Sequence, residues 1–128
     1  MKVAYVDTSC LVAVAVGEDA AGRVAEVVRS FDTLLGANLT VAELRAAGVR
    51  EELPQIDDFL EDLTLVLPAR SLGPELVRSL EVGYLRGADL LHIATALYAA
   101  ESPGDIVFLT LDERQREVAA AVGFQTPL

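Results

Sequence analysis

Four acidic residues lie where their surroundings could support chemistry: Asp7, Glu43, Asp89 and Asp112. Asp7 directly follows the apolar run 3–6, and Asp112 comes three residues after the apolar run 106–109. Glu43 and Asp89 interrupt apolar helical stretches near their starts. Burying a carboxylate among Leu, Val and Ala is costly unless a positive charge compensates it. Four converging carboxylates therefore indicate a hard divalent cation, Mg²⁺ or Mn²⁺, which prefers oxygen ligands.

Each acid also has a structural interpretation without catalysis. Thr40 and Glu43 have the spacing of a capping box, in which the carboxylate turns back to a backbone amide. Asp112 can cap the next helix with Gln115 as its reciprocal partner, and Asp89 can favour a helix start through the helix dipole. The acid after the first apolar run has the weakest structural explanation, because the end of a strand does not require a carboxylate. Their combination and order carry the information.

The elements that must position these acids alternate along the chain. Short unbroken apolar runs are typical of strands buried on both faces of a parallel sheet, and they predict strands at 3–6 and 106–109. Further strands are expected at 33–37 and 64–67, with a short final strand at 124–126. Helices are expected over 10–16, 19–31, 40–50, 54–62, 74–85 and 90–100, with a last helix ending near Val122 before Gly123. Thr8 and Ser9 can cap the first helix and Gly17 can close it. This alternation predicts an α/β fold with a mostly parallel sheet, which binds ligands at the carboxyl ends of its strands.

Length and composition restrict the function further. The 128 residues fit one domain spanning 1–128. A single cysteine, Cys10, excludes an internal disulfide and a cysteine-rich zinc site, and a single histidine, His92, excludes a two-histidine acid/base pair. Aromatic residues make up only 5%, which argues against an aromatic base-stacking platform. The net charge of −10 is unlike that of a generic basic nucleic-acid binder.

The apolar segments are too short to cross a membrane. The longest run, 10–16, falls far short of the roughly 20 residues that a spanning helix needs. Asp7 interrupts the N-terminal stretch, which argues against a signal peptide. We therefore expect a cytoplasmic protein with a reduced thiol, in which Cys10 is an inert small hydrophobe.

Four short blocks occur in a fixed order: VDTS at 6–9, AEL at 42–44 followed by Arg45, LRGADLLHIATA at 85–96 and FLTLDERQ at 108–115. Together they resemble the PIN-domain family, and within it the VapC-type toxins of toxin–antitoxin pairs. The segment AAAVGF at 119–124 is similar to that family's C-terminal helix and turn. The resemblance covers essentially the whole chain. It implies a PIN-like three-layer α/β/α sandwich whose mostly parallel central sheet has four to five strands.

The resemblance also implies an activity. It places the family's acidic site on Asp7, Glu43, Asp89 and Asp112, and it implies a Mg²⁺- or Mn²⁺-dependent endoribonuclease that leaves a 5′-phosphate and a 3′-hydroxyl. Asp7, Asp89 and Asp112 would be direct or water-mediated metal ligands, and Glu43 a ligand or the group that orients the attacking water. We expect the four carboxylates to converge on one pocket at the carboxyl edge of the sheet. A homodimer and a cognate antitoxin are implied as well.

Several neighbours of the acids are candidates for substrate binding: Thr8, Ser9, Thr110, Arg86 and Arg114. The three hydroxyls could bind a phosphate oxygen or hold a carboxylate in place. The two arginines flank the last two acids and could pair with those carboxylates or contact phosphate. His92 lies one turn after Asp89 and could touch the site, although a hydrogen-bonded histidine on an apolar helix is the favoured interpretation.

Two other functions are compatible with a small α/β domain that carries acidic residues. A response-regulator receiver is another small α/β domain with an acidic Mg²⁺ site, but it needs an acidic pair after the first strand and a late lysine. Here Asp7 stands alone and the only lysine is Lys2. A non-catalytic PIN-like binding module is the remaining alternative, and metal-dependent RNA cleavage would separate it from an enzyme.

Overall fold

The centre of the molecule is a four-stranded parallel sheet. This computed structural model describes residues 1–17 and 21–128. Its strands are β1 (Val3–Val6), β2 (Thr33–Gly36), β3 (Leu63–Leu65) and β4 (Val107–Leu109), in the spatial order β3-β2-β1-β4. Ala4 of β1 is in register with Leu34 on one side and Val107 on the other. All pairings are parallel, as the sequence pattern predicted.

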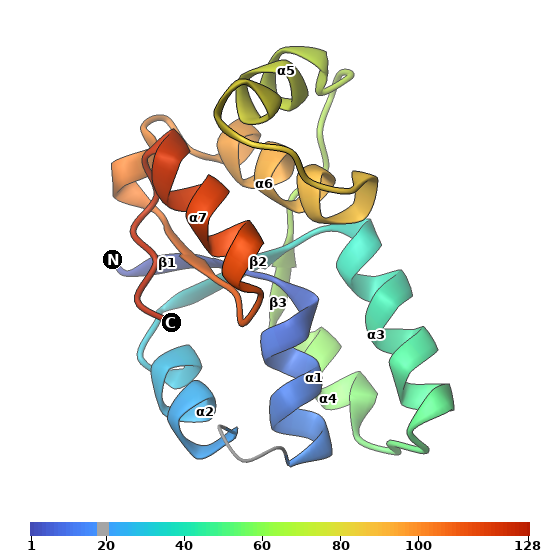
Figure 1. Cartoon of the computed structure of the whole chain (residues 1–128). Helices are drawn as coiled ribbons and strands as arrows, with labels where there is room; N and C mark the ends of the chain where they lie inside the picture. The colour runs from blue at the N-terminus through green and yellow to red at the C-terminus, as the bar shows by residue number, and fades with distance from the viewer. Residues whose placement is uncertain (18–20) are drawn as a thin grey trace.

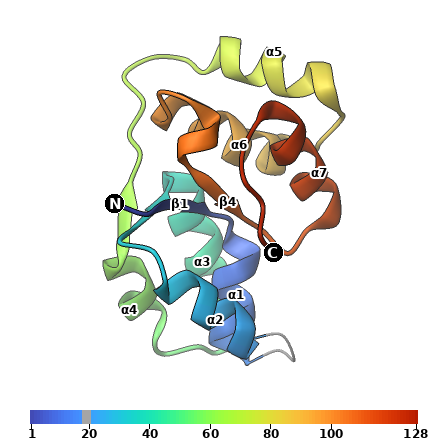
Figure 2. The same ribbon diagram turned by 90° about the vertical axis from the view of Figure 1, so that its left-hand side faces the viewer.

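Two helical layers enclose the sheet (Figures 1 and 2). One contains α1 (Thr8–Val16), α2 (Ala21–Arg29), α3 (Asn38–Arg50) and α4 (Ile56–Glu61), and the other α5 (Gly73–Val82), α6 (Gly87–Ala99) and α7 (Glu113–Val122). Successive strand residues face opposite sides of a sheet. Ala4 and Val6 therefore join one core cluster with Leu44 of α3, whereas Tyr5 and Phe108 join the other with Ile93 of α6. The three-layer α/β/α sandwich is confirmed.

The carboxyl ends of β1 and β4 form a switch point in the topology. The chain leaves β1 through α1 toward one face and leaves β4 through α7 toward the other (Figure 1). In an open parallel sheet such a point leaves a crevice in which ligands bind. The Asp7 amide donates to the carbonyl of Leu109 over 2.8 Å and so holds the two strand ends together. This pairing places the segments after β1 and β4 side by side.

Most element ends lie within a few residues of their predicted positions. Gly17 and Gly123 close α1 and α7 with φ of 81° and 114°, left-handed values that favour glycine. α1 begins at Thr8 rather than at residue 10, because Asp7 is the N-cap in place of Thr8 or Ser9. The predicted start of the second helix at Asp19 lies outside the described residues.

The largest differences are at the edges of the sheet and in the loops. The predicted strand at 124–126 is reduced to an isolated bridge between Gln125 and Val107. β3 ends at Leu65, before the predicted end at 67. α4 begins two residues after Pro54, at Ile56. In the described part of the chain, none of the helices combines the length and apolar character needed to cross a bilayer.

A close contact between α3 and α4 provides a test of this packing. A Cβ at Gly48 would lie 2.6 Å from Cγ1 of Ile56. Gly48→Ala should lower the free energy of unfolding by about 1–3 kcal/mol, although alanine normally favours helices. Gly22→Ala on α2 is the matched control, since a Cβ there meets none of the described residues within 4 Å. It should leave the free energy of unfolding unchanged or raise it by up to about 1 kcal/mol. Urea denaturation measures both, and equal stability of the two variants would contradict the α3–α4 contact.

Candidate active site

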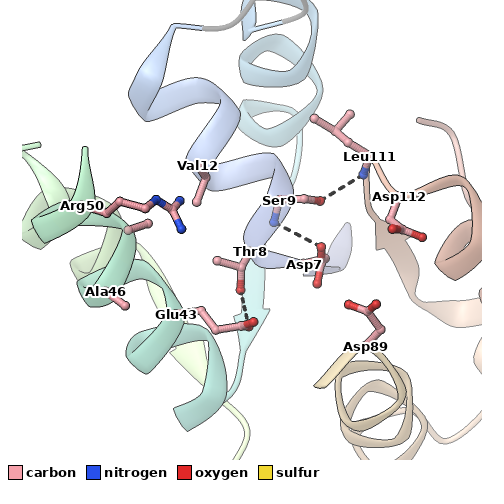
Figure 3. Close-up of a pocket in the computed structure, with 11 residues that line it drawn as sticks. Asp7, Thr8, Ser9, Val12, Glu43, Ala46, Arg50, Asp89, Leu111 and Asp112 are labelled. Carbon is pink, nitrogen blue, oxygen red and sulfur yellow. Dashed lines mark hydrogen bonds between the residues drawn. The ribbon is translucent and has the colours of Figure 1, made fainter. Parts of the chain in front are cut away.

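An open pocket of about 610 Å³ lies where β1 and β4 end. Its lining includes carboxylates from four separate parts of the chain: Asp7 before α1, Glu43 on α3, Asp89 in the first turn of α6 and Asp112 before α7. Figure 3 shows Asp89 and Asp112 on one side of Asp7 and Glu43 on the other. The structure thus brings together residues that are more than a hundred positions apart in the chain.

Asp7 is the best-held of the four carboxylates. The residue is only 5% exposed. Oδ2 accepts a hydrogen bond from the Ser9 amide at 3.1 Å and lies 3.4 Å from the Thr110 hydroxyl, while Oδ1 accepts from Nε2 of Gln115 at 3.4 Å. Asp7 therefore has a structural role that the sequence analysis did not assign to it. It is the N-cap of α1 as well as part of the pocket.

Glu43 is held from the other side by a chain of buried hydrogen bonds. Its Oε1 accepts from the Thr8 hydroxyl at 2.8 Å and lies 2.7 Å from Nε2 of His92. Nδ1 of the same ring lies 2.7 Å from the hydroxyl of Tyr5. Burial raises the pKa of Tyr5 well above its ordinary value, so the hydroxyl remains a donor. Both short contacts fit the tautomer of His92 in which the Tyr5 hydroxyl donates to Nδ1 and the Nε2–H group donates to the carboxylate of Glu43.

The capping-box interpretation of Thr40 and Glu43 is therefore wrong. α3 starts at Asn38, two residues earlier than predicted, so Thr40 lies inside its first turn. The Thr40 hydroxyl accepts from the Ala37 amide at 3.0 Å, whereas the carboxylate of Glu43 points toward Thr8 (Figure 3). Thr40 and Glu43 lie about one turn apart on α3, but the first contacts the Ala37 amide and the second the Thr8 hydroxyl.

His92 satisfies both interpretations that the sequence offered. It is a buried, hydrogen-bonded histidine on a mostly apolar helix, as favoured. Its Nε2 also contacts Glu43 and lies 3.5 Å from Oδ1 of Asp7, so it belongs to the site. The sequence could not show this, because the contact joins α6 to α3 across the core.

Asp112 caps α7 as expected, but its predicted partner does something else. Oδ1 of Asp112 accepts from the Gln115 amide at 2.7 Å. The Gln115 side chain does not return to Asp112. Its Oε1 accepts from the Thr110 hydroxyl at 2.6 Å, and its Nε2 donates to Asp7 and to the carbonyl of Asp89 at 3.2 Å. Gln115 thus connects the segments that carry three of the acids.

Sequence reasoning missed this function of Gln115, although a signal was present. Gln115 shares one face of α7 with Val118, Ala119 and Val122, at intervals of three, four and seven residues. All four are buried. A polar amide on an otherwise apolar helix face must have hydrogen-bond partners, and here they are the residues around the pocket.

The carboxylates influence one another electrostatically. The pKa of Asp89 is raised above its ordinary value by partial burial and by the neighbouring charges of Asp7, Asp112 and Glu43, while His92 opposes the shift. Cys10 lies outside the pocket. Burial raises the pKa of its thiol to about 12, in keeping with an inert hydrophobe.

The donor set can be compared with what a cation requires. All four side chains offer carboxylate oxygen, the ligand type that Mg²⁺ and Mn²⁺ prefer. Among the described residues, however, no group of three or more His, Cys, Asp or Glu side chains is gathered closely enough to hold an ion. The residues therefore fit a hard cation by chemistry and by their shared pocket, but not as a closed ligand cluster.

The candidate hydroxyls hold other groups in place. Thr8 donates to Glu43, and the Ser9 hydroxyl accepts from the Leu111 amide at 3.1 Å. Thr110 is buried, donates to Gln115 and accepts from the Asp112 amide at 3.0 Å. Of the two roles left open for these hydroxyls, their contacts support positioning. Arg86 and Arg114 line a neighbouring pocket with Asp89 and Asp112.

Substitutions at Asp7 separate its charge from its capping role. Asp7→Asn keeps an oxygen that can accept from the Ser9 amide, and asparagine caps helices as well as aspartate does. Its amino group then faces Nε2 of Gln115, which is also a donor, so some stability is lost, but Asp7→Ala removes the cap as well and should lose about 1 kcal/mol more. Thermal denaturation checks both. Equal losses in the two variants would show that the cap does not stabilise α1.

Asp89→Asn should raise the stability of the metal-free protein above the ordinary carboxyl pKa. Because the pKa of Asp89 is raised on folding, the folded state holds its proton more tightly, and this contribution to stability is lost as the pH rises through the raised value. Asparagine does not titrate. The difference in free energy of unfolding between variant and wild type should grow as the pH rises from the ordinary carboxyl pKa to the raised one, and then stay constant. It should remain below about 1 kcal/mol because solvent screens this site. Denaturation in chelator across a pH series measures this difference, and a difference independent of pH would contradict the coupling.

A family model, the PIN domain, matches residues 4–121 and includes all four carboxylates of the pocket. No curated protein matches the chain significantly. PIN domains are generally nucleases. The match extends over nearly the whole sequence and agrees with the parallel sheet between two helical layers. The chain therefore belongs to the PIN domain family.

Proposed function

We propose that this protein is a Mg²⁺- or Mn²⁺-dependent endoribonuclease, with residues 1–128 acting as one catalytic domain. The observation that carries the proposal is the pocket lined by Asp7, Glu43, Asp89 and Asp112. Isolated surface acids need no common location, yet these four come from four separate parts of the fold. Their mutual effect on the pKa of Asp89 is further support.

A bound divalent cation supplies a water of lowered pKa and neutralises charge on the phosphate and the leaving oxygen. The chain's own residues bind and orient. Asp7, Asp89 and Asp112 would hold the cation directly or through water. Glu43, which Thr8 and His92 fix in one orientation, would join them or orient the attacking water. Gln115 would keep Asp7 aligned with the other two aspartates.

Hydrolysis by a metal-activated water suits the inventory of this chain better than attack by the substrate's own 2′-hydroxyl. The latter route needs a general acid and a general base, for which two histidines are the natural choice. This sequence has one, and that histidine is buried between Tyr5 and Glu43. Products with a 5′-phosphate and a 3′-hydroxyl are therefore expected.

We further propose that the enzyme is a homodimeric toxin with a cognate antitoxin. Four carboxylates in one pocket of a chain with net charge −10 attract cations. An arginine of an antitoxin suits such a site because its planar fork can bridge two carboxylates. Suppression of cleavage by the product of an adjoining gene would support this role, and cleavage unchanged by any such product would count against it.

RNA cleavage with mapping of new 5′ ends tests the activity. Mg²⁺ or Mn²⁺ should support cleavage and a chelator should abolish it. Asp7→Asn, Glu43→Gln, Asp89→Asn and Asp112→Asn should each lower the rate by at least about a hundredfold, the scale for loss of a positioned catalytic group. The matched control is Asp58→Asn on α4, an exposed acid outside the pocket, which should cleave at the wild-type rate.

Two outcomes would contradict the proposal. RNA binding without cleavage under any divalent cation would favour the non-catalytic binding module. Undiminished cleavage in chelator would show that the acids serve another purpose. Circular dichroism of each variant establishes that lost activity does not reflect lost folding.

A further inference from the structure

A second pocket adjoins the acidic one. It measures about 330 Å³ and is lined by Tyr84, Leu85, Arg86, Asp89, Asp112 and Arg114. Asp89 and Asp112 line both pockets, so the two hollows meet at these carboxylates. A ligand that reaches the acids from this side must pass the residues between α5 and α6 and the first turn of α7.

The second pocket places two arginines beside two aspartates in an acidic protein. The chain has 20 acids and 10 lysines and arginines, yet Arg86 and Arg114 both lie here beside two aspartates. No salt bridge joins either arginine to a carboxylate within the described ranges 1–17 and 21–128. Of the two possibilities left open by the sequence, pairing with the neighbouring acids is therefore not what the structure contains.

Arg114 is also held in a position that suits anion binding. Its Nε donates to the carbonyl of Tyr84 at 3.1 Å, which ties α7 to the connection between α5 and α6. This bond uses Nε alone. The two terminal amino groups keep the planar fork with which arginine binds a phosphate. Among the described residues that line the acidic pocket, Arg50 is the one basic side chain, and its Nε pairs with Glu51 at 3.0 Å.

Tyr84 adds an aromatic surface beside these cations. Its side chain is 70% exposed although it is a large hydrophobic residue. An exposed ring next to a phosphate-binding arginine can stack on a nucleic-acid base, and such stacking tolerates any base because every base has an aromatic face. One ring can hold one base, which agrees with the low aromatic content that excludes an extended platform.

We propose that this second pocket binds the nucleotide next to the cleaved phosphodiester. Its base stacks on Tyr84, and its phosphate contacts Arg86 and Arg114. The inference rests on the proposed function, because it assumes that the acids act on an RNA strand. It accounts for the approach of RNA to a chain of net charge −10: the strand enters from the side where cations are not paired with acids.

Binding to a cleavage-deficient protein tests the subsite separately from catalysis. In the Asp7→Asn background with Mg²⁺, fluorescence anisotropy measures the Kd for a short labelled oligoadenylate and for an abasic strand with the same phosphates. Tyr84→Ala should weaken oligoadenylate binding roughly 5- to 150-fold and leave the abasic strand unaffected. Tyr84→Phe, which keeps the ring, should restore binding.

The arginines should behave differently from the tyrosine. Arg86→Gln and Arg114→Gln should weaken both strands and lower the slope of log Kd against log salt by about 0.7 each, the value for one phosphate contact on a single strand. Arg23→Gln on α2 is the matched control, since Arg23 is exposed and lies outside both pockets. Its Kd and salt slope should match those of the parent.

Several results would overturn the proposal. These are an absence of measurable oligoadenylate binding, equal effects of Tyr84→Ala on both strands, or salt slopes unchanged by the two arginine substitutions. A change in oligomeric state of Tyr84→Ala, with RNA binding intact, would assign the ring to a protein interface instead. Wild-type cleavage is measured in parallel. If it persists while the binding predictions fail, the subsite is wrong and the proposed function stands.

Discussion

Repulsion among four carboxylates is the constraint around which the rest of this structure is arranged. Like charges brought to one pocket oppose folding. The pKa of Asp89 is raised first by its partial burial and then by the charges of Asp7 and Asp112. The topology of the fold accommodates this repulsion. At the switch point between β1 and β4, α1 and α7 leave toward opposite faces of the sheet. Glu43, Asp89 and Asp112 therefore reach the solvent of an open pocket, which screens their charges, whereas Asp7 is buried and is held by hydrogen bonds. The packed cores on either face of the sheet hold the pocket walls in place.

Two chains of hydrogen-bonded side chains fix the orientation of Glu43 and Asp7 in this pocket. One runs from Tyr5 through His92 to Glu43, and the other from Thr110 through Gln115 to Asp7. Buried polar groups are stable only when they are fully partnered, and each chain satisfies its members with side chains from different elements. The same contacts that make these groups tolerable in the core also fix the orientation of two carboxylates. Stability and positioning therefore depend on the same bonds.

The net charge does not show that carboxylates and unpaired arginines occupy different parts of the same region. A total of −10 suggests poor affinity for a polyanion, but affinity depends on where the cations lie. Arg86 and Arg114 stand next to Asp89 and Asp112 without pairing with a carboxylate of the described residues. The acidic pocket, which suits a cation, and the neighbouring pocket with two arginines, which suits a phosphate, can thus lie side by side. Other acids lie away from these two pockets, such as Asp57 on α4, which pairs with Arg45.

Local patterns in the sequence determined which elements form and which acids follow them. Unbroken apolar runs predicted β1 and β4, glycines predicted the ends of α1 and α7, and the order of the acids indicated the family. Tertiary structure decided the partners. Tyr5 and His92 are 87 residues apart, and no local spacing encodes their bond. The capping role of Asp7, the turn of Glu43 toward Thr8 and His92, and the inward amide of Gln115 all depend on which helix packs against which. Periodicity shows which face of a segment is buried, but only the packed chain shows what that face meets.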